Sequence, residues 1–407
     1  MDKDNIYESI GGVKELWERT SLNKSNGDYH YLKEINNLEG PWVYVENQKM
    51  LMFATYNYLG LLDDERIKQE SIKAIEKYGT GTHGVRNFGG SLDIHGKLEK
   101  RIADFVGRKY SIAYSTGYMT NLSTINAIVG RKDWILSDKL NHASIVDGCL
   151  ISGAVHKRFQ HNDMSHLESL LSKAPENVTK LVVADAVFSM DGDIFNLPDA
   201  VELCNKYNAL LMIDEAHSLG ILGQNGRGIE EHFNMKDSID IKMGTLSKAI
   251  PAIGGYIACN NEKLITYLKH LSRGFIFSAA IPPAIAAAAY KTLEILETEG
   301  AAKRDKLKNN VDLLLKYLHN AGFNTGNTET PIIPIMLGAD ENAIKMTTYC
   351  QNNNIFVLPV ISPAVPVGQA RLRVNVTAAH TSEDIKTVAD IIIKGGKKFG
   401  FIDYASN

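Results

Sequence analysis

A lysine beside small hydroxyl and glycine residues is the first candidate for chemistry in this sequence. Lys248 follows Thr245-Leu246-Ser247, directly after the apolar run at 239–244, and two glycines stand at 254 and 255. Burial disfavours an ammonium ion and so lowers the pKa of a lysine, which leaves a neutral amine able to attack an aldehyde. Most lysines are solvated surface charges, but these neighbours favour Lys248 as a Schiff-base amine.

A carboxylate and an imidazole follow another apolar run, at 209–214. Asp214 ends the run and His217 stands three residues later, within the sequence DEAH. Such a carboxylate can hold a proton on a ring nitrogen, and the histidine can donate to a ring oxygen. A helix N-cap beside an ordinary core histidine is the competing interpretation. A helicase is excluded, because the chain has no G-x-x-x-x-G-K-[ST] phosphate loop.

Two further sites follow apolar runs in the same way. Gly117 and Tyr118 come just after 111–115, where free backbone N–H groups at a helix start would suit a phosphate. His142 comes shortly after 134–137, where a flat imidazole could stack on a planar ring. Alone, these would be an ordinary turn and a core histidine. All four sites together predict a planar, phosphorylated, aldehyde-bearing cofactor, pyridoxal 5'-phosphate (PLP).

The elements that must position these residues alternate between short apolar runs and helical patterns. The expected strands are 111–115, 134–137, 181–187, 209–214, 239–244 and 254–260. Amphipathic helices between them indicate crossovers in a mostly parallel sheet, buried on both faces. In such a sheet the ligand lies beyond the carboxyl ends of the strands, where the four sites fall.

The pattern changes along the chain and predicts three parts. The first is an N-terminal arm at 1–50, and the second is a PLP-binding large domain at 51–289. Long helices followed by short strand-like pieces predict a smaller C-terminal α+β domain at 290–407. The fold class expected is therefore α/β, with a mostly parallel large-domain sheet and a smaller second domain.

Composition excludes several classes of protein. The 407 residues include 44% apolar and 22% charged residues, which is globular composition, and the net charge of −3 argues against a nucleic-acid binder. The four cysteines and twelve histidines show no disulfide or metal-ligand spacing, so we expect no metal. The N-terminus lacks the features of a signal or transit peptide, and the apolar stretch at 275–290 contains Pro282-Pro283. We expect a cytoplasmic protein.

The sequence resembles the α-oxoamine synthase family of fold-type I PLP enzymes from about residue 40 to 400. The motifs that carry the resemblance stand in family order and are YNYLG (56–60), YGTGTHGVRNFGGSLDIHGKLE (78–99), STGYMTN (115–121), NHASIVDG (141–148), VFSMDGD (187–193), DEAHSLGILGQNGRG (214–228), GTLSKAIPAIGGYIA (244–258), FIFSAAIPP (275–283) and ARLRVNVTAAHT (370–381). The family implies a PLP-dependent acyltransferase that condenses an amino acid with an acyl thioester and releases CO2. It also implies a homodimer with active sites at the subunit interface.

The resemblance implies a role for each matching residue. Lys248 looks like the Schiff-base lysine and general base, Asp214 like the partner of the pyridine nitrogen, and His142 like the residue stacked on the ring. The expected contacts to the ring oxygen are Ser189 and His217. The expected phosphate contacts are Gly117, Tyr118, Thr245 and, from the neighbouring subunit, Ser278. Arg373 and Asn57 are expected to bind the substrate, since a guanidinium forms paired hydrogen bonds with a carboxylate.

The branch of the family is a separate question. YNYLG, STGYMTN, KRFQHNDM (157–164) and PVISPAVP (359–366) look most like bacterial serine palmitoyltransferases, which favours L-serine. ARLRVNVTAAHT and Gly84-Val85-Arg86 look as much like glycine- or alanine-using branches, of the 2-amino-3-ketobutyrate CoA ligase or 8-amino-7-oxononanoate synthase type. Pro251 and Ala279-Ala280 differ from the residues common at these positions in the family. These differences affect selectivity for the amino acid and the acyl group rather than cofactor chemistry.

Other interpretations of the residues stay open. A PLP aminotransferase on the same fold would use the same lysine, aspartate and phosphate site. A non-catalytic subunit of a synthase is disfavoured, since it could dispense with Lys248. The acyl donor is coenzyme A or an acyl carrier protein, and the sequence does not distinguish them. A peripheral membrane contact also stays open, although no basic amphipathic helix supports it.

Overall fold

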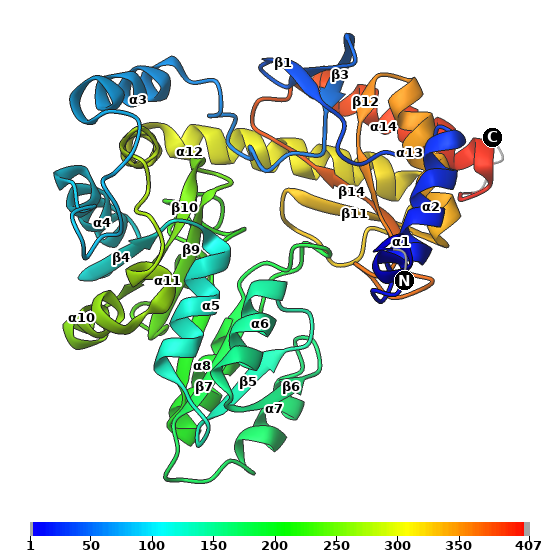
Figure 1. Cartoon of the computed structure of the whole chain (residues 1–407). Coiled ribbons are helices and arrows are strands. Elements are labelled where there is room, and N and C mark those ends of the chain that lie inside the picture. Colours follow the sequence, from blue (N-terminus) through cyan, green and yellow to red (C-terminus); the bar gives the residue numbers. More distant parts are fainter. Residues whose placement is uncertain (1–2, 403–407) are drawn as a thin grey trace.

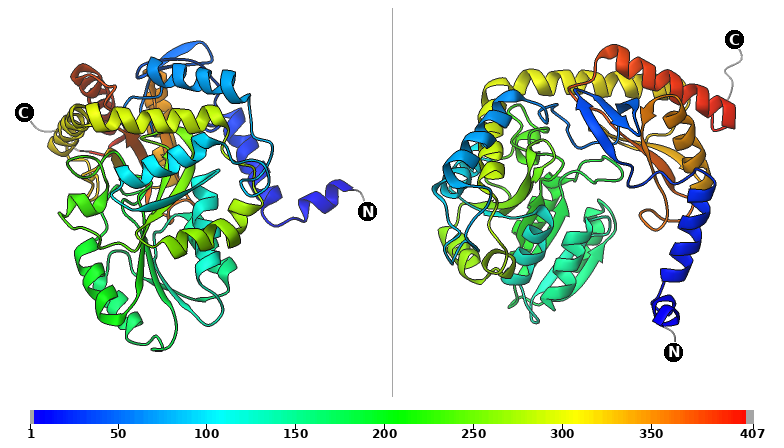
Figure 2. Two further views of the ribbon diagram at one scale, coloured as in Figure 1. Left: turned by 90° about the vertical axis from the view of Figure 1, so that its left-hand side faces the viewer. Right: turned by 45° about the horizontal axis from the view of Figure 1, so that its top comes forward.

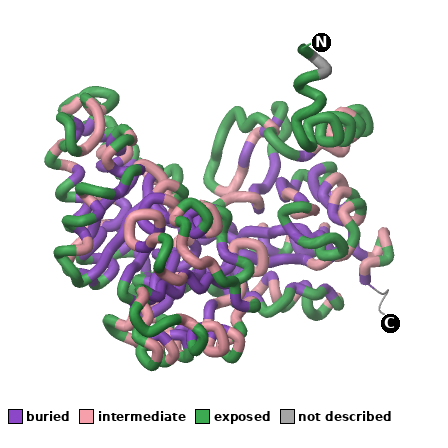
Figure 3. Tube along the Cα trace, turned by 60° about the horizontal axis from the view of Figure 1, so that its bottom comes forward, coloured by how far each residue is buried: buried purple, intermediate pink, exposed green. Residues whose placement is uncertain are grey.

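The computed structural model describes residues 3–402 of the chain (Figure 1). The first two residues of the expected arm and the last five of the expected C-terminal domain lie outside this range. Most of the buried residues gather in a large sheet and in the elements packed on it (Figure 3). The strand ends of this sheet carry the residues with candidate chemistry.

The central sheet has seven strands in the order β4-β10-β9-β8-β7-β5-β6. Their bounds are β4 (Tyr110–Tyr114), β5 (Trp134–Asp138), β6 (Val155–Phe159), β7 (Lys180–Asp185), β8 (Leu210–Asp214), β9 (Ile241–Ser247) and β10 (Pro251–Cys259). Neighbouring strands from β9 to β6 are parallel, and only β10 runs antiparallel to both of its neighbours. The predicted mostly parallel sheet is confirmed.

Both faces of the sheet are covered by helices. Alternate residues of β7 contribute to two different hydrophobic clusters, Leu181 and Val183 to one and Val182 and Ala184 to the other. One cluster contains residues of α5 (Gly117–Ile128), α6 (Ala143–Ser152), α10 (Glu262–Leu271) and α11 (Arg273–Ile276). The other contains residues of α3 (Glu65–Tyr78), α4 (Asp93–Phe105), α7 (Met164–Leu171), α8 (Leu197–Tyr207) and α9 (Ile229–His232). This double burial explains why the strands are continuous apolar runs.

A 38-residue helix, α12 (Pro283–Asn320), crosses from the large sheet to the C-terminal region (Figure 2). It begins at Pro283, which is favourable in the first helical turn because the missing N–H has no helical partner there. The boundary predicted at residue 290 falls inside this helix, so the two predicted domains would share it.

The C-terminal region is an α+β unit. It contains an antiparallel sheet in the order β11-β14-β13, with bounds β11 (Ile332–Gly338), β13 (Leu358–Val360) and β14 (Ala370–Asn375). Its helices are α13 (Asp340–Asn352) and α14 (Ser382–Phe399). The predicted smaller α+β unit is confirmed.

Part of the N-terminal segment packs with this unit rather than forming only an arm. Three antiparallel strands, β1 (Ile35–Glu39), β2 (Trp42–Val45) and β3 (Gln48–Met52), form a sheet whose last partner is β12 (Ile355–Phe356). Before them, α1 (Lys3–Glu8) and α2 (Val13–Ser25) project from the body (Figure 2). No residue of α2 is buried, and Trp17 is 71% exposed. Among the described helices, none combines the length and apolarity needed to cross a bilayer.

A cluster of buried ions joins α9, β9, the segment before β4 and the segment after β8. The Glu230 carboxylate accepts two hydrogen bonds of 2.8 Å from Arg108 Nη2 and lies 2.9 Å from Lys242 Nζ. Glu215 completes the cluster at 3.8 Å from the same lysine. Burial raises the pKa of Glu230, but Lys242 and Arg108 outweigh it and lower the pKa to about 2. Two cations therefore balance two carboxylates inside the protein.

Replacing one of these carboxylates should destabilise the fold. Glu230→Gln leaves two buried cations with one carboxylate, and we expect a loss of about 3–5 kcal/mol in the free energy of unfolding. The folded-state pKa lies below the usual value, so the wild-type advantage should be complete above about pH 4.5 and decline as pH falls toward 2. Thermal unfolding at neutral pH measures the difference. Glu202→Gln, on the exposed face of α8, is the control and should change stability by less than about 0.5 kcal/mol. Equal melting temperatures for the two variants would contradict a role for the cluster.

Candidate active site

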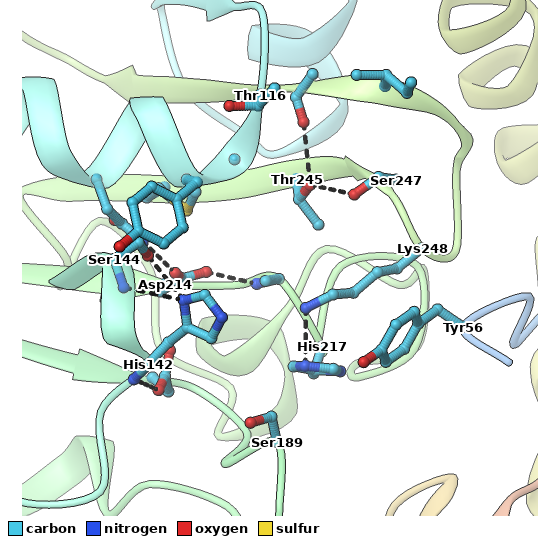
Figure 4. A pocket seen from close by; sticks show the side chains of 18 of the residues that line it. Tyr56, Thr116, His142, Ser144, Ser189, Asp214, His217, Thr245, Ser247 and Lys248 are labelled. Carbon is cyan, nitrogen blue, oxygen red and sulfur yellow. Dashed lines mark hydrogen bonds between the residues drawn. The ribbon is translucent and has the colours of Figure 1, made fainter. Parts of the chain in front are cut away.

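A pocket of about 350 Å³ lies at the carboxyl ends of the central strands (Figure 4). Its walls come from β10, from the ends of β7, β8 and β9, and from segments that follow β4, β5, β7, β8 and β9, together with Tyr56. The residues lining it are Tyr56, Thr116, Gly117, Tyr118, Asn121, His142, Ser144, Asp185, Ser189, Met190, Asp214, Ala216, His217, Met243, Thr245, Ser247, Lys248, Ile253 and Gly254. This is where ligands bind in open parallel sheets.

One end of the pocket is built for an anion. Thr116 caps α5 and accepts from the Met119 N–H at 3.2 Å, which leaves the N–H groups of Gly117 and Tyr118 at the positive end of the helix. Thr245 Oγ1 lies opposite, and a Cβ on Gly117 would come within 2.9 Å of it. Glycine therefore keeps the cradle open. The Tyr118 phenol bonds to Asp147, so its contribution to this cradle is its backbone.

Asp214 is fixed at the end of β8 and is only 3% exposed. Its Oδ1 accepts from the Ala216 N–H at 2.9 Å, and its Oδ2 accepts from Asn121 Nδ2 at 2.7 Å. Asp185 pairs with Asp214 across β7 and β8, and burial together with this second carboxylate raises the pKa of Asp185 well above its usual value. A protonated ring nitrogen at Asp214 would supply the positive charge that this pair of carboxylates favours, so the pocket fits PLP.

His142 is held as a flat, neutral ring beside Asp214 (Figure 4). Its Nδ1 lies 2.8 Å from Ser144 Oγ, and its backbone N–H donates to Asp185 at 2.8 Å. Burial lowers the pKa of His142, so the ring carries no charge at neutral pH. A neutral imidazole held in this way can stack on an aromatic ring.

Lys248 and His217 meet in the middle of the pocket. Lys248 Nζ lies 2.7 Å from His217 Nε2 and 5.5 Å from the centre of the Tyr56 ring. Burial lowers the pKa of Lys248 to about 8, with Asp214 and Asp185 opposing the shift. Burial and the nearby Lys248 lower the pKa of His217 well below its usual value. The pocket thus offers a partly neutral amine beside a neutral imidazole.

Arg373 approaches the pocket from β14, outside the lining residues. Its Nε donates to the Ser189 carbonyl at 2.6 Å, and its guanidinium carbon lies 5.0 Å from the centre of the Tyr56 ring. The side chain is only 9% exposed, and its buried Nη2 has no hydrogen-bond partner. An unpaired buried donor costs free energy, so a carboxylate at this position would be strongly favoured.

The segment that carries Ser189 is held by the C-terminal unit. Arg371 Nη1 bonds to Asp191 Oδ1 at 2.5 Å and donates to the Met190 carbonyl at 3.2 Å. Hydroxyl groups of Thr328 and Thr330 donate to the carbonyl of Gly192. Gly192 has φ 73° and lies against Thr328 and the Ile332 carbonyl, so only glycine suits this position.

The remaining predicted residues lie outside the pocket. Asn57 Oδ1 accepts from the N–H groups of Leu61 and Leu62, at 2.9 and 3.1 Å, so it holds a turn and borders the neighbouring groove. Ser278 follows α11 and is half-buried away from the pocket of its own chain. Their predicted roles stay predictions. The other predicted cofactor residues, Gly117, Tyr118, His142, Ser189, Asp214, His217, Thr245 and Lys248, line one pocket.

Several lining residues were not predicted. Asn121 stands four residues after Gly117, one turn along α5, and this spacing could have indicated it. Asp185 ends β7 as Asp214 ends β8, so the strand-end rule could have found it as well. Ser144, Ser247 and Tyr56 carry no comparable signal by themselves.

Comparisons with known proteins cover nearly the whole chain. A family model described as aminotransferase class I and II matches residues 48–392. Serine palmitoyltransferase from Sphingobacterium spiritivorum is 40% identical over 394 residues, 97% of this chain and 97% of that protein. The 8-amino-7-oxononanoate synthase from Thermoanaerobacter pseudethanolicus is 39% identical over 395 residues, 97% of this chain and 100% of that protein. A solved structure of a serine palmitoyltransferase variant from S. paucimobilis, with a bound PLP–myriocin aldimine, has a TM-score of 0.94 at 32% identity and covers 97% of this chain and 100% of that chain.

The lowered pKa of Lys248 predicts how the apoprotein takes up PLP. A neutral amine is needed to attack the aldehyde, so the rate of uptake should rise with pH to a midpoint of about 8 and then level off. Growth of the visible absorption band after mixing measures this rate. An ordinary lysine would place the midpoint about two units higher, and this outcome would contradict a buried amine. Lys248→Ala is the control and should give no such band.

Proposed function

Since the chain belongs to the aminotransferase class I and II family, and within it to the PLP-dependent α-oxoamine synthases, we propose that it joins L-serine to a long-chain acyl thioester. The reaction forms a carbon–carbon bond between the amino-acid Cα and the acyl carbonyl. It releases CO2 from the amino-acid carboxylate and the free thiol from the thioester. The product is a long-chain α-amino ketone.

PLP, when bound, supplies an electron sink for the electron pair left on the amino-acid Cα. The residues proposed to hold it are Gly117, Tyr118 and Thr245 at the phosphate, Asp214 at the ring nitrogen, His142 on the ring face, and Ser189 and His217 at the ring oxygen. Asp214 is suited to its role because Asn121 and the Ala216 N–H hold its carboxylate in one orientation. An aspartate fixed in this way keeps a proton on the nitrogen that faces it.

Lys248 and Arg373 have different proposed roles toward the amino-acid substrate. Lys248 Nζ is the proposed general base that takes the Cα proton, because burial keeps part of its population neutral near pH 8. Arg373 is the proposed partner of the amino-acid carboxylate, since its buried Nη2 lacks a hydrogen bond. Both groups lie within 5.5 Å of the centre of the Tyr56 ring. The proposed base and the proposed carboxylate-binding cation thus both lie beside the Tyr56 ring.

The proposed choice of acyl donor rests on a groove beside Tyr56. It has a volume of about 660 Å³ and borders the reaction pocket at Tyr56. Its apolar walls include Leu38, Val43 and Met52 from the N-terminal strands. Among the described residues that line it, Asp63 is the only charged one. An uncharged acyl chain suits these walls, whereas an ω-carboxylate would find no cation and would meet an aspartate.

A second candidate is the alanine-using branch with an ω-carboxylated acyl donor. The similarity to an 8-amino-7-oxononanoate synthase, at 39% identity, favours it. L-Serine is preferred here because the proposed uncharged acyl chain is that of the serine-using branch. The acyl carrier, coenzyme A or a carrier protein, does not alter this choice.

We also propose a homodimer in which Ser278 reaches the phosphate of the neighbouring subunit. Two exposed aromatic side chains support it, Phe277 beside Ser278 at 73% exposed and Phe88 at 86% exposed. The segments that carry them are bridged by Val85 and Ala279. Exposed aromatic residues gathered in this way are typical of a protein interface.

Substrate pairing tests the proposed reaction. Purified enzyme is offered L-serine, glycine or L-alanine, each with palmitoyl-CoA or pimeloyl-CoA, and free thiol and CO2 are measured together. We expect equal release of both products, fastest with L-serine and palmitoyl-CoA. Fastest turnover with L-alanine and pimeloyl-CoA would select the second candidate. Amino-group transfer to a keto acid without thiol release would rule out a synthase.

Arg373→Lys tests the carboxylate site. Lysine keeps the charge but lacks the paired donors, so we expect the KM for the amino acid to rise by about tenfold or more, with PLP affinity unchanged. Steady-state kinetics and equilibrium binding of PLP measure the two effects. Arg158→Lys, an exposed arginine on β6, is the control and should leave both unchanged. An unaltered KM in Arg373→Lys would assign the carboxylate to another residue.

A further inference from the structure

Both ring nitrogens of His217 have a side-chain partner. Nε2 lies 2.7 Å from Lys248 Nζ (Figure 4), and Nδ1 lies 2.8 Å from the hydroxyl of Tyr58. Tyr58 belongs to the segment between β3 and α3 and is only 1% exposed. It lies outside the pocket walls, so it can act on the chemistry only through a neighbouring residue.

The hydrogen bond between Tyr58 and His217 has one direction. Burial raises the pKa of Tyr58, so the phenol keeps its proton. Among the described residues, His217 Nδ1 is the only acceptor within hydrogen-bond distance of the phenol. His217 is neutral and has one ring nitrogen without a proton. The phenol therefore donates to Nδ1.

We propose that Tyr58 is a positioning residue that holds His217 as the tautomer with its proton on Nε2. In molecules whose Lys248 amine is neutral, the 2.7 Å contact is then a donation from Nε2 to the lone pair of the amine. With PLP bound, the same N–H would be available to donate to the cofactor's ring oxygen, which rests on the role proposed for His217. Without Tyr58 the ring can place its proton on Nδ1 and turn a lone pair toward that oxygen, which repels it.

Tyr58→Phe tests the proposal through PLP binding, which needs neither the amino acid nor the thioester. Phenylalanine fills the same space and removes only the hydroxyl. We expect roughly tenfold weaker binding of PLP to the apoprotein, measured by equilibrium titration. We also expect a smaller share of the visible band relative to the near-ultraviolet band in the loaded protein, because a poorer donor at the ring oxygen changes its charge.

Two further variants separate positioning from general stability. Tyr114→Phe removes another buried hydroxyl, which donates to Ser272 at 3.0 Å outside the pocket. It should lower the melting temperature about as much as Tyr58→Phe and leave PLP affinity and absorption unchanged. In a His217→Gln background the amide carries its own N–H, so adding Tyr58→Phe should have no further effect on PLP affinity.

Two outcomes would overturn the proposal. One is that Tyr58→Phe behaves like Tyr114→Phe, with lower stability and unchanged PLP binding and absorption. The other is that Tyr58→Phe weakens PLP binding equally with His217 present or replaced, so that its action does not pass through the imidazole. Neither outcome depends on which substrates the enzyme joins, so a failure of the proposed reaction is distinguishable from a failure here.

Discussion

Buried carboxyl groups at the ends of parallel strands are the constraint on which the rest of the site depends. Asp138, Asp185 and Asp214 end β5, β7 and β8, and all three are buried. Carboxylates without water need positive charge or donors close by. Burial lowers the pKa of His161, but the carboxylates of Asp138 and Asp193 outweigh it and raise the pKa to about 10. This histidine is therefore a cation at neutral pH. Lys248 and a bound pyridinium ring would serve the other two.

The single antiparallel strand of the central sheet, β10, forms part of the pocket wall. β10 turns back along β9 so that Gly255 pairs with Thr245. This hairpin carries the proposed phosphate residue Thr245 and, beyond the end of β9, Lys248. Gly254 lines the pocket from the returning strand, and its carbonyl accepts from the Thr245 hydroxyl at 3.0 Å. The proposed phosphate residue and the candidate Schiff-base lysine are therefore both positioned by one strand pair.

The sequence predicted what local patterning determines. The central strands are apolar runs because both faces of the sheet are covered. The polar residues that follow them were found because ligands bind beyond the carboxyl ends of parallel strands. Strands β1 and β6 were missed because their side chains are largely exposed and polar, so neither apolar runs nor regular alternation marks them. The bond from Arg373 to the Ser189 carbonyl joins residues 184 positions apart, and no local signal predicts it. The oxygen of Asn57 holds a backbone turn, which its motif did not indicate, and its proposed contact with the substrate stays a prediction.

The attachment of the Ser189 segment to the C-terminal sheet has a mechanical consequence. Ser189 lines the pocket, and its carbonyl is tied to Arg373. Two residues away, Asp191 is tied to Arg371, and both arginines belong to β14. If that sheet rotates as a rigid body, these two bonds would move the pocket wall with it. Any shift of the C-terminal unit would therefore reach Ser189, the residue proposed to contact the cofactor's ring oxygen, without a separate hinge.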